Sequence, residues 1–149
     1  MKLKMTRDSL QRGLAAVGAS IPTRTTLPVL SNILIEVGAN QVAMSGTDLD
    51  IAVSICVPAE VEEGGALTVP AKKFQELTRE LPEHPVRLAA KGDRLEISCG
   101  RATFRLNGMP RDEFPTFPAV DFTQSWKVPG RVLQELIRQT SFAVSTEES

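Results

Sequence analysis

The chain has 149 residues, 42% of them apolar and 23% charged, with a formal net charge of −1, which corresponds to about one folded domain and excludes a disordered chain. Its two cysteines exclude a disulfide framework, and a single histidine without any tyrosine leaves mainly carboxylates and lysines for acid–base catalysis. No apolar run approaches the roughly 18 residues of a membrane span, and the N-terminus lacks the apolar core of a signal peptide, so we expect a soluble, cytoplasmic protein.

The first part of the chain is predicted to form a strand, a helix and further strands. Alternation predicts a short strand at residues 3–5, and apolar residues at helical spacing from Leu10 to Val17 predict a helix that Thr6 can cap. Residues 19–28 hold two prolines and several threonines, which is typical of a loop. Three further strands are predicted at residues 29–37, 41–45 and 49–57.

The same order of elements is predicted to follow. A short strand at residues 67–69 leads to Pro70, a residue that the first helical turn tolerates. An apolar stripe that begins at Phe74 predicts a helix, and Pro82 ends it. Three more strands are predicted near residues 86–90, 95–99 and 102–106.

The last part of the chain begins with a proline-rich connector at residues 108–122, whose phenylalanines indicate that it packs on a surface. A short strand at residues 126–128 and a helix that starts at Pro129 are predicted to follow, with an apolar stripe that includes Leu133 and Leu136. Because a strand and a helix cannot bury such a stripe within their own unit, we expect the chain to be part of a longer protein.

An internal repeat organises these elements. Residues 69–79 and 128–138 are identical at six of eleven positions, and the start of the chain is a weaker third copy. The repeated unit is one strand, one helix and three strands, which predicts an α+β fold with helices on one face of antiparallel sheets. The predicted organisation is a domain over 1–122, made of the repeats 1–62 and 63–122, and the truncated start of a second domain over 123–149.

Charge is distributed unevenly along this pattern. Residues 36–65 carry six acids and no base, whereas each helix carries bases on the side opposite its apolar anchors, such as Phe74 and Leu133. A row of such bases would contact phosphates without reading bases, although ordinary surface solubility explains scattered charges equally well. Charge and helical phase assign to this face Arg7, Arg12, Arg79, Arg131 and Arg138.

Four segments, in this order and spacing, resemble the N-terminal domain of the bacterial beta sliding clamp, the processivity subunit of DNA polymerase III. They are RTTLPVLSNIL at 24–34, GTDLDI at 46–51, TVPAKKF at 68–74 and EFPTFP at 113–118. The resemblance covers essentially the whole chain and implies the DNA-clamp fold, in which three such domains per subunit and two subunits per ring encircle double-stranded DNA. It also implies a non-catalytic protein without a cofactor, whose polymerase and clamp-loader cleft lies in later domains.

The resemblance also implies particular contacts. Arg24 and Lys72 match positions at which the family contacts DNA. The strand over 101–106 resembles the one that joins the neighbouring subunit in the family's homodimer, and an exposed strand edge is suited to such pairing. The implied interface residues are the apolar anchors Phe104 and Leu106 and the charged Lys73 and Arg101. The alternative for Phe104 is that it faces the core of its own domain.

A second function hypothesis is a small α+β enzyme or ligand-binding domain that uses the acidic segment 36–65. Asp48 and Asp50 share one face of a strand and could bind a metal ion, although capping of a turn is the simpler role because no further ligands are nearby. Cys56 and Cys99 lack metal-ligand spacing, so no metal site is expected. This hypothesis predicts that Asp48, Asp50 and a lysine converge in a cleft.

Overall fold

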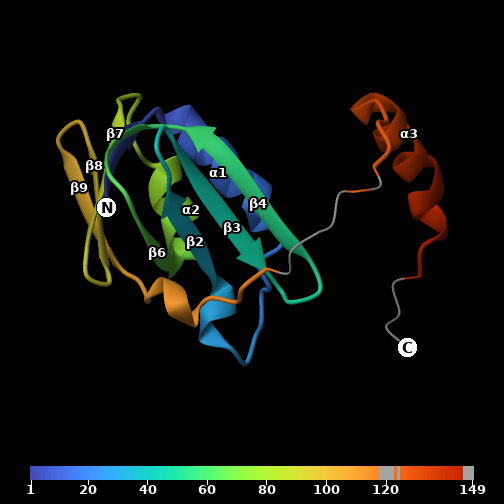
Figure 1. The fold of residues 1–149 in the computed structure, drawn as a ribbon, viewed down its shortest axis with the longest axis horizontal. Coiled ribbons are helices and arrows are strands. Elements are labelled where there is room, and N and C mark those ends of the chain that lie inside the picture. The colour runs from blue at the N-terminus through green and yellow to red at the C-terminus, as the bar shows by residue number, and fades with distance from the viewer. Residues whose placement is uncertain (118–122, 124, 146–149) are drawn as a thin grey trace. The chain divides into compact units, whose positions relative to one another are not determined.

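A computed structural model describes residues 1–117, 123 and 125–145, and Figure 1 shows its ribbon. The chain divides into two compact units, Met1–Phe117 and Pro118–Ser149. We call these the first unit and the second unit and describe each by itself. The predicted domain boundary at residue 122 lies outside the described residues and stays a prediction.

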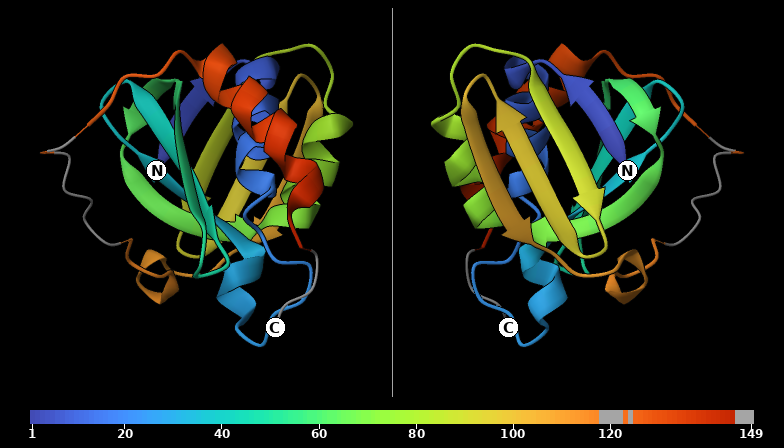
Figure 2. Two further views of the ribbon diagram at one scale, coloured as in Figure 1. Left: turned by 90° about the vertical axis from the view of Figure 1, so that its right-hand side faces the viewer. Right: turned by 90° about the vertical axis from the view of Figure 1, so that its left-hand side faces the viewer.

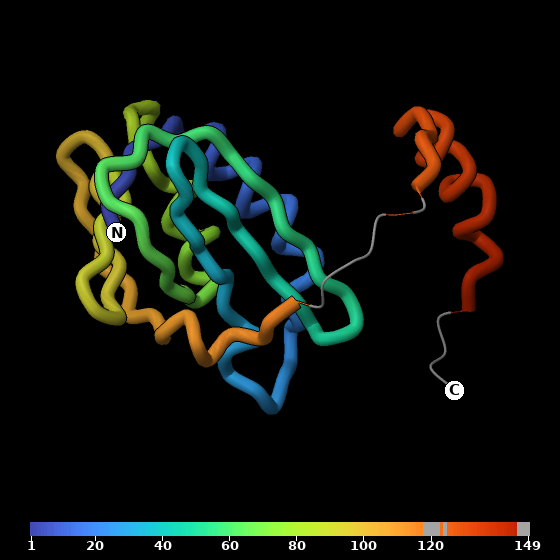
Figure 3. The backbone as a smooth tube through the Cα atoms, viewed as in Figure 1, coloured from blue at the N-terminus to red at the C-terminus, as the bar shows by residue number. Residues whose placement is uncertain are grey.

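The first unit contains two successive strand–helix–strand repeats, which can be followed along the backbone in Figure 3. The first repeat consists of β1 (Lys2–Met5), α1 (Arg7–Gly18), β2 (Asn32–Val37), β3 (Gln41–Thr47), β4 (Ala52–Pro58) and β5 (Glu60–Glu63). The second repeat consists of β6 (Gly65–Pro70), α2 (Ala71–Arg79), β7 (Val86–Lys91), β8 (Arg94–Cys99) and β9 (Ala102–Asn107). Thr6 caps α1 as predicted, because its Oγ1 accepts the N–H of Ser9 at 3.1 Å.

The strands form two antiparallel sheets. One sheet has five strands in the order β5-β1-β7-β8-β9, and the other has four in the order β4-β3-β2-β6. Figure 1 shows α1 and α2 together behind the four-stranded sheet, and Figure 2 shows the first unit from two further sides. Buried side chains from both helices and both sheets form one core, with Leu10, Phe74 and Ile97 fully buried in it. The predicted α+β arrangement with helices on one face is confirmed.

Some local predictions are wrong. Residues 28–31 form a 3₁₀ turn (Pro28–Ser31) instead of the start of a strand, and residues 49–51 lie in the turn between β3 and β4. In that turn Leu49 has a φ of 84°, which a strand cannot accommodate. The strand β5 was not predicted, because its acidic sequence becomes a strand only by pairing with β1, where Lys4 meets Glu60 at 3.3 Å.

The second unit contains α3 (Gly130–Thr140), which is predicted, and no strand among its described residues. The predicted strand at 126–128 is therefore wrong: Trp126 is 93% exposed, and a strand needs a neighbour to bond with. The apolar stripe of α3 is exposed as the sequence leads one to expect, with Leu133 at 50% and Ile137 at 58%. Among the described residues no helix has the length and apolar character required to cross a membrane.

Candidate nucleic-acid interface

The two helices of the first unit run antiparallel and are bonded side chain to backbone. Gln11 Nε2 donates to the carbonyl of Thr78 at 2.8 Å, and Gln75 Nε2 donates to the carbonyl of Leu14 at 2.9 Å. From Gln11 to Leu14 the chain of α1 advances, while their partners in α2 go back from Thr78 to Gln75, so the helix directions are opposite. The N-terminal end of α2 therefore lies beside the C-terminal end of α1.

The exposed face of this pair carries bases. Leu10 and Phe74 are fully buried, while Arg12, Lys72 and Arg79 are exposed. Helical phase predicted this exposure correctly. The same surface also holds acids, namely Asp8, Glu76 and Glu80. The bases are therefore interspersed with acids, and the face attracts an anion only where a base projects from it.

The position of the bases at the start of α2 is unfavourable for the helix itself. Lys72 and Lys73 occupy its first turn, where no acid is present, whereas α1 has Asp8 there. Arg131 is the second residue of α3, and the first turn of α3 likewise contains no acid. The positive end of the helix dipole disfavours each such cation by about 0.3–1 kcal/mol. The starts of α2 and α3 both carry this cost.

Arg7 makes contacts within its own unit. Its side chain is 24% exposed, its Nη1 donates to the carbonyl of Leu81 at 2.8 Å, and its Nη2 lies 3.6 Å from Glu83. Arg7 therefore joins the start of α1 to the segment after α2 and has little freedom to meet a phosphate. Its contact with a phosphate stays a prediction, and the three bases of the helix face considered below are Arg12, Lys72 and Arg79.

The loop and the second unit hold the remaining predicted contacts. Arg24 is exposed in the loop that connects α1 to Pro28. In α3, Arg131 is exposed, and Arg138 is exposed but bonded to Glu135, with Nη2 at 2.7 Å and Nε at 3.0 Å. The hydrogen bond from Arg138, followed by one from Gln139, lowers the pKa of Glu135, and the bond to Glu135 raises the pKa of Arg138.

This ion pair gives a first testable prediction. The Arg138→Ala substitution should raise the pKa of Glu135 toward its ordinary value, because it removes the larger cause of the shift. Since the folded pKa is lowered, the pair supports α3 above the ordinary pKa of glutamate and loses this effect as pH falls through the lowered value. An NMR titration of the Glu135 carboxyl carbon measures this, and an unchanged titration curve would contradict it.

Three of the predicted dimer residues lie on β9, at the edge of the five-stranded sheet, or directly before it, and the fourth, Lys73, lies in α2. Strand β9 pairs with β8 and is the last strand in the sheet order, so its outer edge has no strand partner among the described residues. Arg101 and Lys73 are exposed. Phe104 is partly buried against the core, and Leu106 is 7% exposed within it. Both apolar side chains thus contribute to their own unit, and a role for them in a dimer remains a prediction.

The acidic segment does not form the cleft that the enzyme hypothesis requires. Asp48 Oδ1 accepts the N–H groups of Asp50 at 3.1 Å and Ile51 at 2.7 Å, which is the turn-capping role. Among the described residues, no group of three or more potential ligands could hold a metal ion. The carboxylate of Asp48 is therefore used within the turn.

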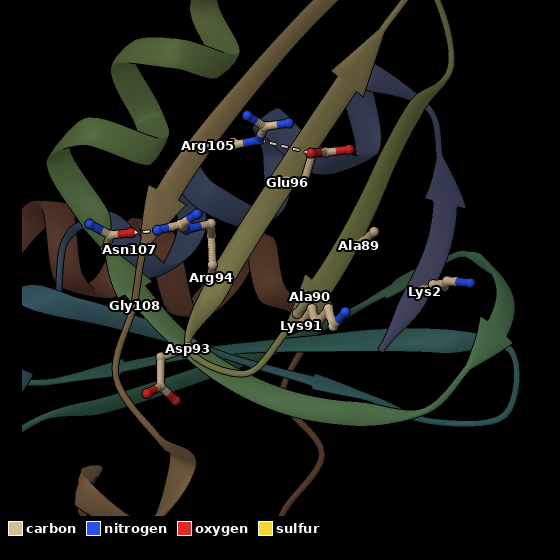
Figure 4. Close-up of a pocket in the computed structure, with 10 residues that line it drawn as sticks. All are labelled: Lys2, Ala89, Ala90, Lys91, Asp93, Arg94, Glu96, Arg105, Asn107 and Gly108. Atoms are coloured by element: carbon tan, nitrogen blue, oxygen red, sulfur yellow. Dashed lines mark hydrogen bonds and ion pairs between the residues drawn. The ribbon is translucent and has the colours of Figure 1, made fainter.

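A broad open hollow of about 870 Å³ lies elsewhere, on the face of β7, β8 and β9 that is turned away from the core. Figure 4 shows that Arg105 pairs with Glu96, at 3.0 Å, and that Arg94 donates to Asn107, at 3.4 Å. Its lining includes neither Asp48 nor Asp50. We therefore find no support in this hollow for the enzyme hypothesis.

Sequence reasoning missed Gln11 and Gln75, which join the helices. A signal was available, because a glutamine follows the apolar anchor in all three copies of the repeat: Leu10-Gln11, Phe74-Gln75 and Leu133-Gln134. It also missed the ion pair between Arg111 and Glu36, at 3.3 Å, which fastens the segment after β9 to β2. No local pattern predicts a pairing between residues so far apart.

Comparison with known proteins places this arrangement in a family. The family model of the DNA polymerase III beta subunit, N-terminal domain, matches residues 1–118. The beta sliding clamp of Bacillus subtilis is 33% identical over 158 residues, which is 100% of this chain and 42% of that protein. The beta sliding clamp of Chlamydia pneumoniae is 32% identical over 150 residues, which is 100% of this chain and 41% of that protein.

Solved structures agree. The crystal structure of the Bacillus subtilis DNA polymerase sliding clamp matches with a TM-score of 0.95 and 32% identity over 100% of this chain and 42% of that one. The Caulobacter crescentus pol III beta structure matches with a TM-score of 0.93 and 36% identity over 100% and 40%. This chain thus spans about two fifths of the length of these relatives. It belongs to the DNA polymerase III beta subunit family and carries that family's N-terminal domain.

Proposed function

We propose that this chain is the N-terminal part of a DNA sliding clamp, a non-catalytic processivity factor that encircles duplex DNA and tethers the replicative polymerase. The observation that carries the proposal is the antiparallel pair of α1 and α2, which presents Arg12, Lys72 and Arg79 on its exposed face. Arg24 in the adjoining loop adds a fourth cation, and Arg131 and Arg138 extend the same design to α3.

A sliding tether requires contacts of this kind. Long side chains with exposed charges meet phosphates weakly and interchangeably, whereas contacts to base edges would hold the ring at one sequence. On the described helix faces the bases stand among acids, so the attraction stays moderate. The function follows from ring topology, and the helix face only has to allow movement along the duplex.

The ring and its partners are part of the proposal. The outer edge of β9, together with the exposed charges of Arg101 and Lys73, would pair with a second copy of the full-length protein to close a homodimeric ring. Polymerase III and the clamp loader would bind the full-length protein mainly at a cleft outside residues 1–149. The site of action would be the cytoplasm, on replicating DNA.

The start of α2 offers a test that separates function from stability. The Lys72→Glu substitution should raise the free energy of unfolding by about 0.3–1 kcal/mol, because it places an acid at the positive end of the helix. The same change should weaken binding to duplex DNA. The matched control is Lys91→Glu on the far face of β7, which should leave DNA binding unchanged. Urea denaturation and a DNA-binding titration measure the two effects, and a gain in both would contradict the proposal.

The tether itself is tested with the full-length protein. After loading by the clamp loader, the protein should be retained on closed circular DNA and lost when the circle is cut once, because a ring slides off a free end. Gel filtration of labelled protein with each DNA measures retention. Equal retention on both forms would overturn topological tethering.

A further inference from the structure

We propose that Gln11 and Gln75 form a reciprocal pair of hydrogen bonds, the glutamine bridge, that fixes the spacing of α1 and α2 and thereby positions the bases that face DNA. This inference rests on the proposed function for the role of those bases. The glutamine bridge itself is defined by hydrogen bonds alone. Each glutamine donates to a backbone carbonyl of the other helix, at 2.8 Å and 2.9 Å.

The two bonds are equivalent under the internal repeat. Gln11 and Gln75 are 64 positions apart, and so are the two residues that accept, Leu14 and Thr78. Each glutamine therefore reaches the residue three positions after the other glutamine. The helices exchange the same bond in both directions, which fixes their separation and also their relative slide.

The local structure shows what the bond from Gln11 supplies. Thr78 lies in the last turn of α2, which ends at Arg79, so its carbonyl has no donor within the helix, and Pro82, four residues later, has no N–H to offer. Gln11 supplies the missing donor. Thr78 is buried, and a buried carbonyl without any donor would destabilise the end of α2, so this bond has a structural basis independent of DNA.

Gly18 makes room for the second bond. A Cβ at this position would lie 2.6 Å from Gln75 Nε2, closer than such atoms approach in folded proteins. Glycine as the last residue of α1 leaves this space open to the Gln75 amide. The same apolar–glutamine pair recurs at Leu133-Gln134 in α3, which indicates that the device belongs to the repeated unit.

The glutamine bridge lies directly beside the proposed DNA contacts. Arg12 follows Gln11, and Arg79 follows Thr78, so one hydrogen bond joins the two residues that directly precede these bases. With the helices fixed, the bases need not be ordered when a phosphate arrives, and less binding free energy is lost to that ordering. Gln11 and Gln75 are thus positioning residues and make no contact with DNA themselves.

The test uses the chain 1–149 with Gln11→Met and Gln75→Met combined, which keeps side-chain length and removes both donors. Spin labels at Ala16→Cys and Glu76→Cys, in a Cys56→Ser background, report the distance between the helices. We expect a broader distance distribution and duplex affinity lower by about threefold to tenfold, the size of one or two neutral hydrogen bonds. Gln134→Met, which removes the corresponding glutamine of α3, serves as the matched control and should change neither measurement.

Gly18→Ala provides a second, independent variant, because it keeps both glutamines and displaces the Gln75 amide. It should broaden the distance distribution in the same way, and it keeps the test decisive if the double variant does not fold. An unchanged distance distribution in the variants would show that the glutamine bridge does not fix the helix spacing. A broader distribution with unchanged affinity would overturn its positioning role. Absence of salt-dependent DNA binding by the unsubstituted chain would overturn the proposed function instead. The distance measurement would still show whether the glutamine bridge fixes the helix spacing.

Discussion

Reversing the three exposed bases of the helix pair should abolish most of the attraction between this chain and duplex DNA. With Arg12→Glu, Lys72→Glu and Arg79→Glu together, only Arg24 remains of the first unit's proposed contacts. Each phosphate neutralised by a base contributes about −0.9 to the slope of log affinity against log salt concentration. Three lost contacts should make the slope less negative by about 2.7, while the contacts of Arg24 and of α3 remain. The measurement is a fluorescence-anisotropy titration at several salt concentrations.

A matched triple reversal distinguishes position from net charge. Arg87→Glu, Lys91→Glu and Arg94→Glu change the charge of the chain equally, but these residues lie on the face of β7 and β8 turned away from the core. This control should keep the original slope within about one unit, since it removes no phosphate contact. If both triple variants lose the slope equally, the attraction comes from net charge alone and the helix face has no special role.

Removing the largest fully buried side chain should strongly destabilise the first unit. Phe74 is fully buried at the centre of the core that α1, α2 and both sheets share. The Phe74→Ala substitution should lower the free energy of unfolding by about 3–5 kcal/mol, because it removes apolar contacts and leaves a cavity. A domain of this size is stable by only about 5–15 kcal/mol. Urea denaturation followed by far-ultraviolet circular dichroism measures the loss.

Phe142→Ala is the matched control for this change. Phe142 is 88% exposed, so its truncation should alter the unfolding free energy of the first unit by less than about 0.5 kcal/mol. A loss below about 1 kcal/mol for Phe74→Ala would show that the core does not depend on this side chain and would contradict the packing described above.

Much of the fold could be predicted because it depends on local patterns. Periodicity located both helices of the first unit and most strands, and the repeat between 69–79 and 128–138 indicated the order of elements. Helical phase also placed Arg12, Lys72 and Arg79 correctly on the exposed side. These inferences need only the geometry of one helix and one strand at a time.

The remaining features depend on contacts between distant residues. Strand β5 forms because β1 offers it an edge, and Arg7 loses its freedom to a carbonyl that is 74 positions away. Leu49 adopts its positive φ because the side chains of Thr47 and Asp48 hold the turn. No single window of sequence contains these partners, so helical phase alone assigned Arg7 to the contact face.

The same distinction explains the near-neutral net charge. A net charge of −1 argues against a general attraction to nucleic acid. The structure separates the bases of the helix face from the acids of the turn between β3 and β4 and of β5, where Asp48 caps the turn and Glu60 pairs with Lys4. Attraction to DNA is therefore expected on one face only, which is consistent with weak contacts that can be exchanged.

The most direct test of this account is a salt titration of duplex binding by the unsubstituted chain 1–149. The account predicts weak binding whose log affinity falls with log salt concentration at a slope of about −3 or −4, independent of the sequence of the duplex. A slope indistinguishable from zero, or an affinity that depends on base sequence, would contradict the assignment of the helix face to DNA phosphates.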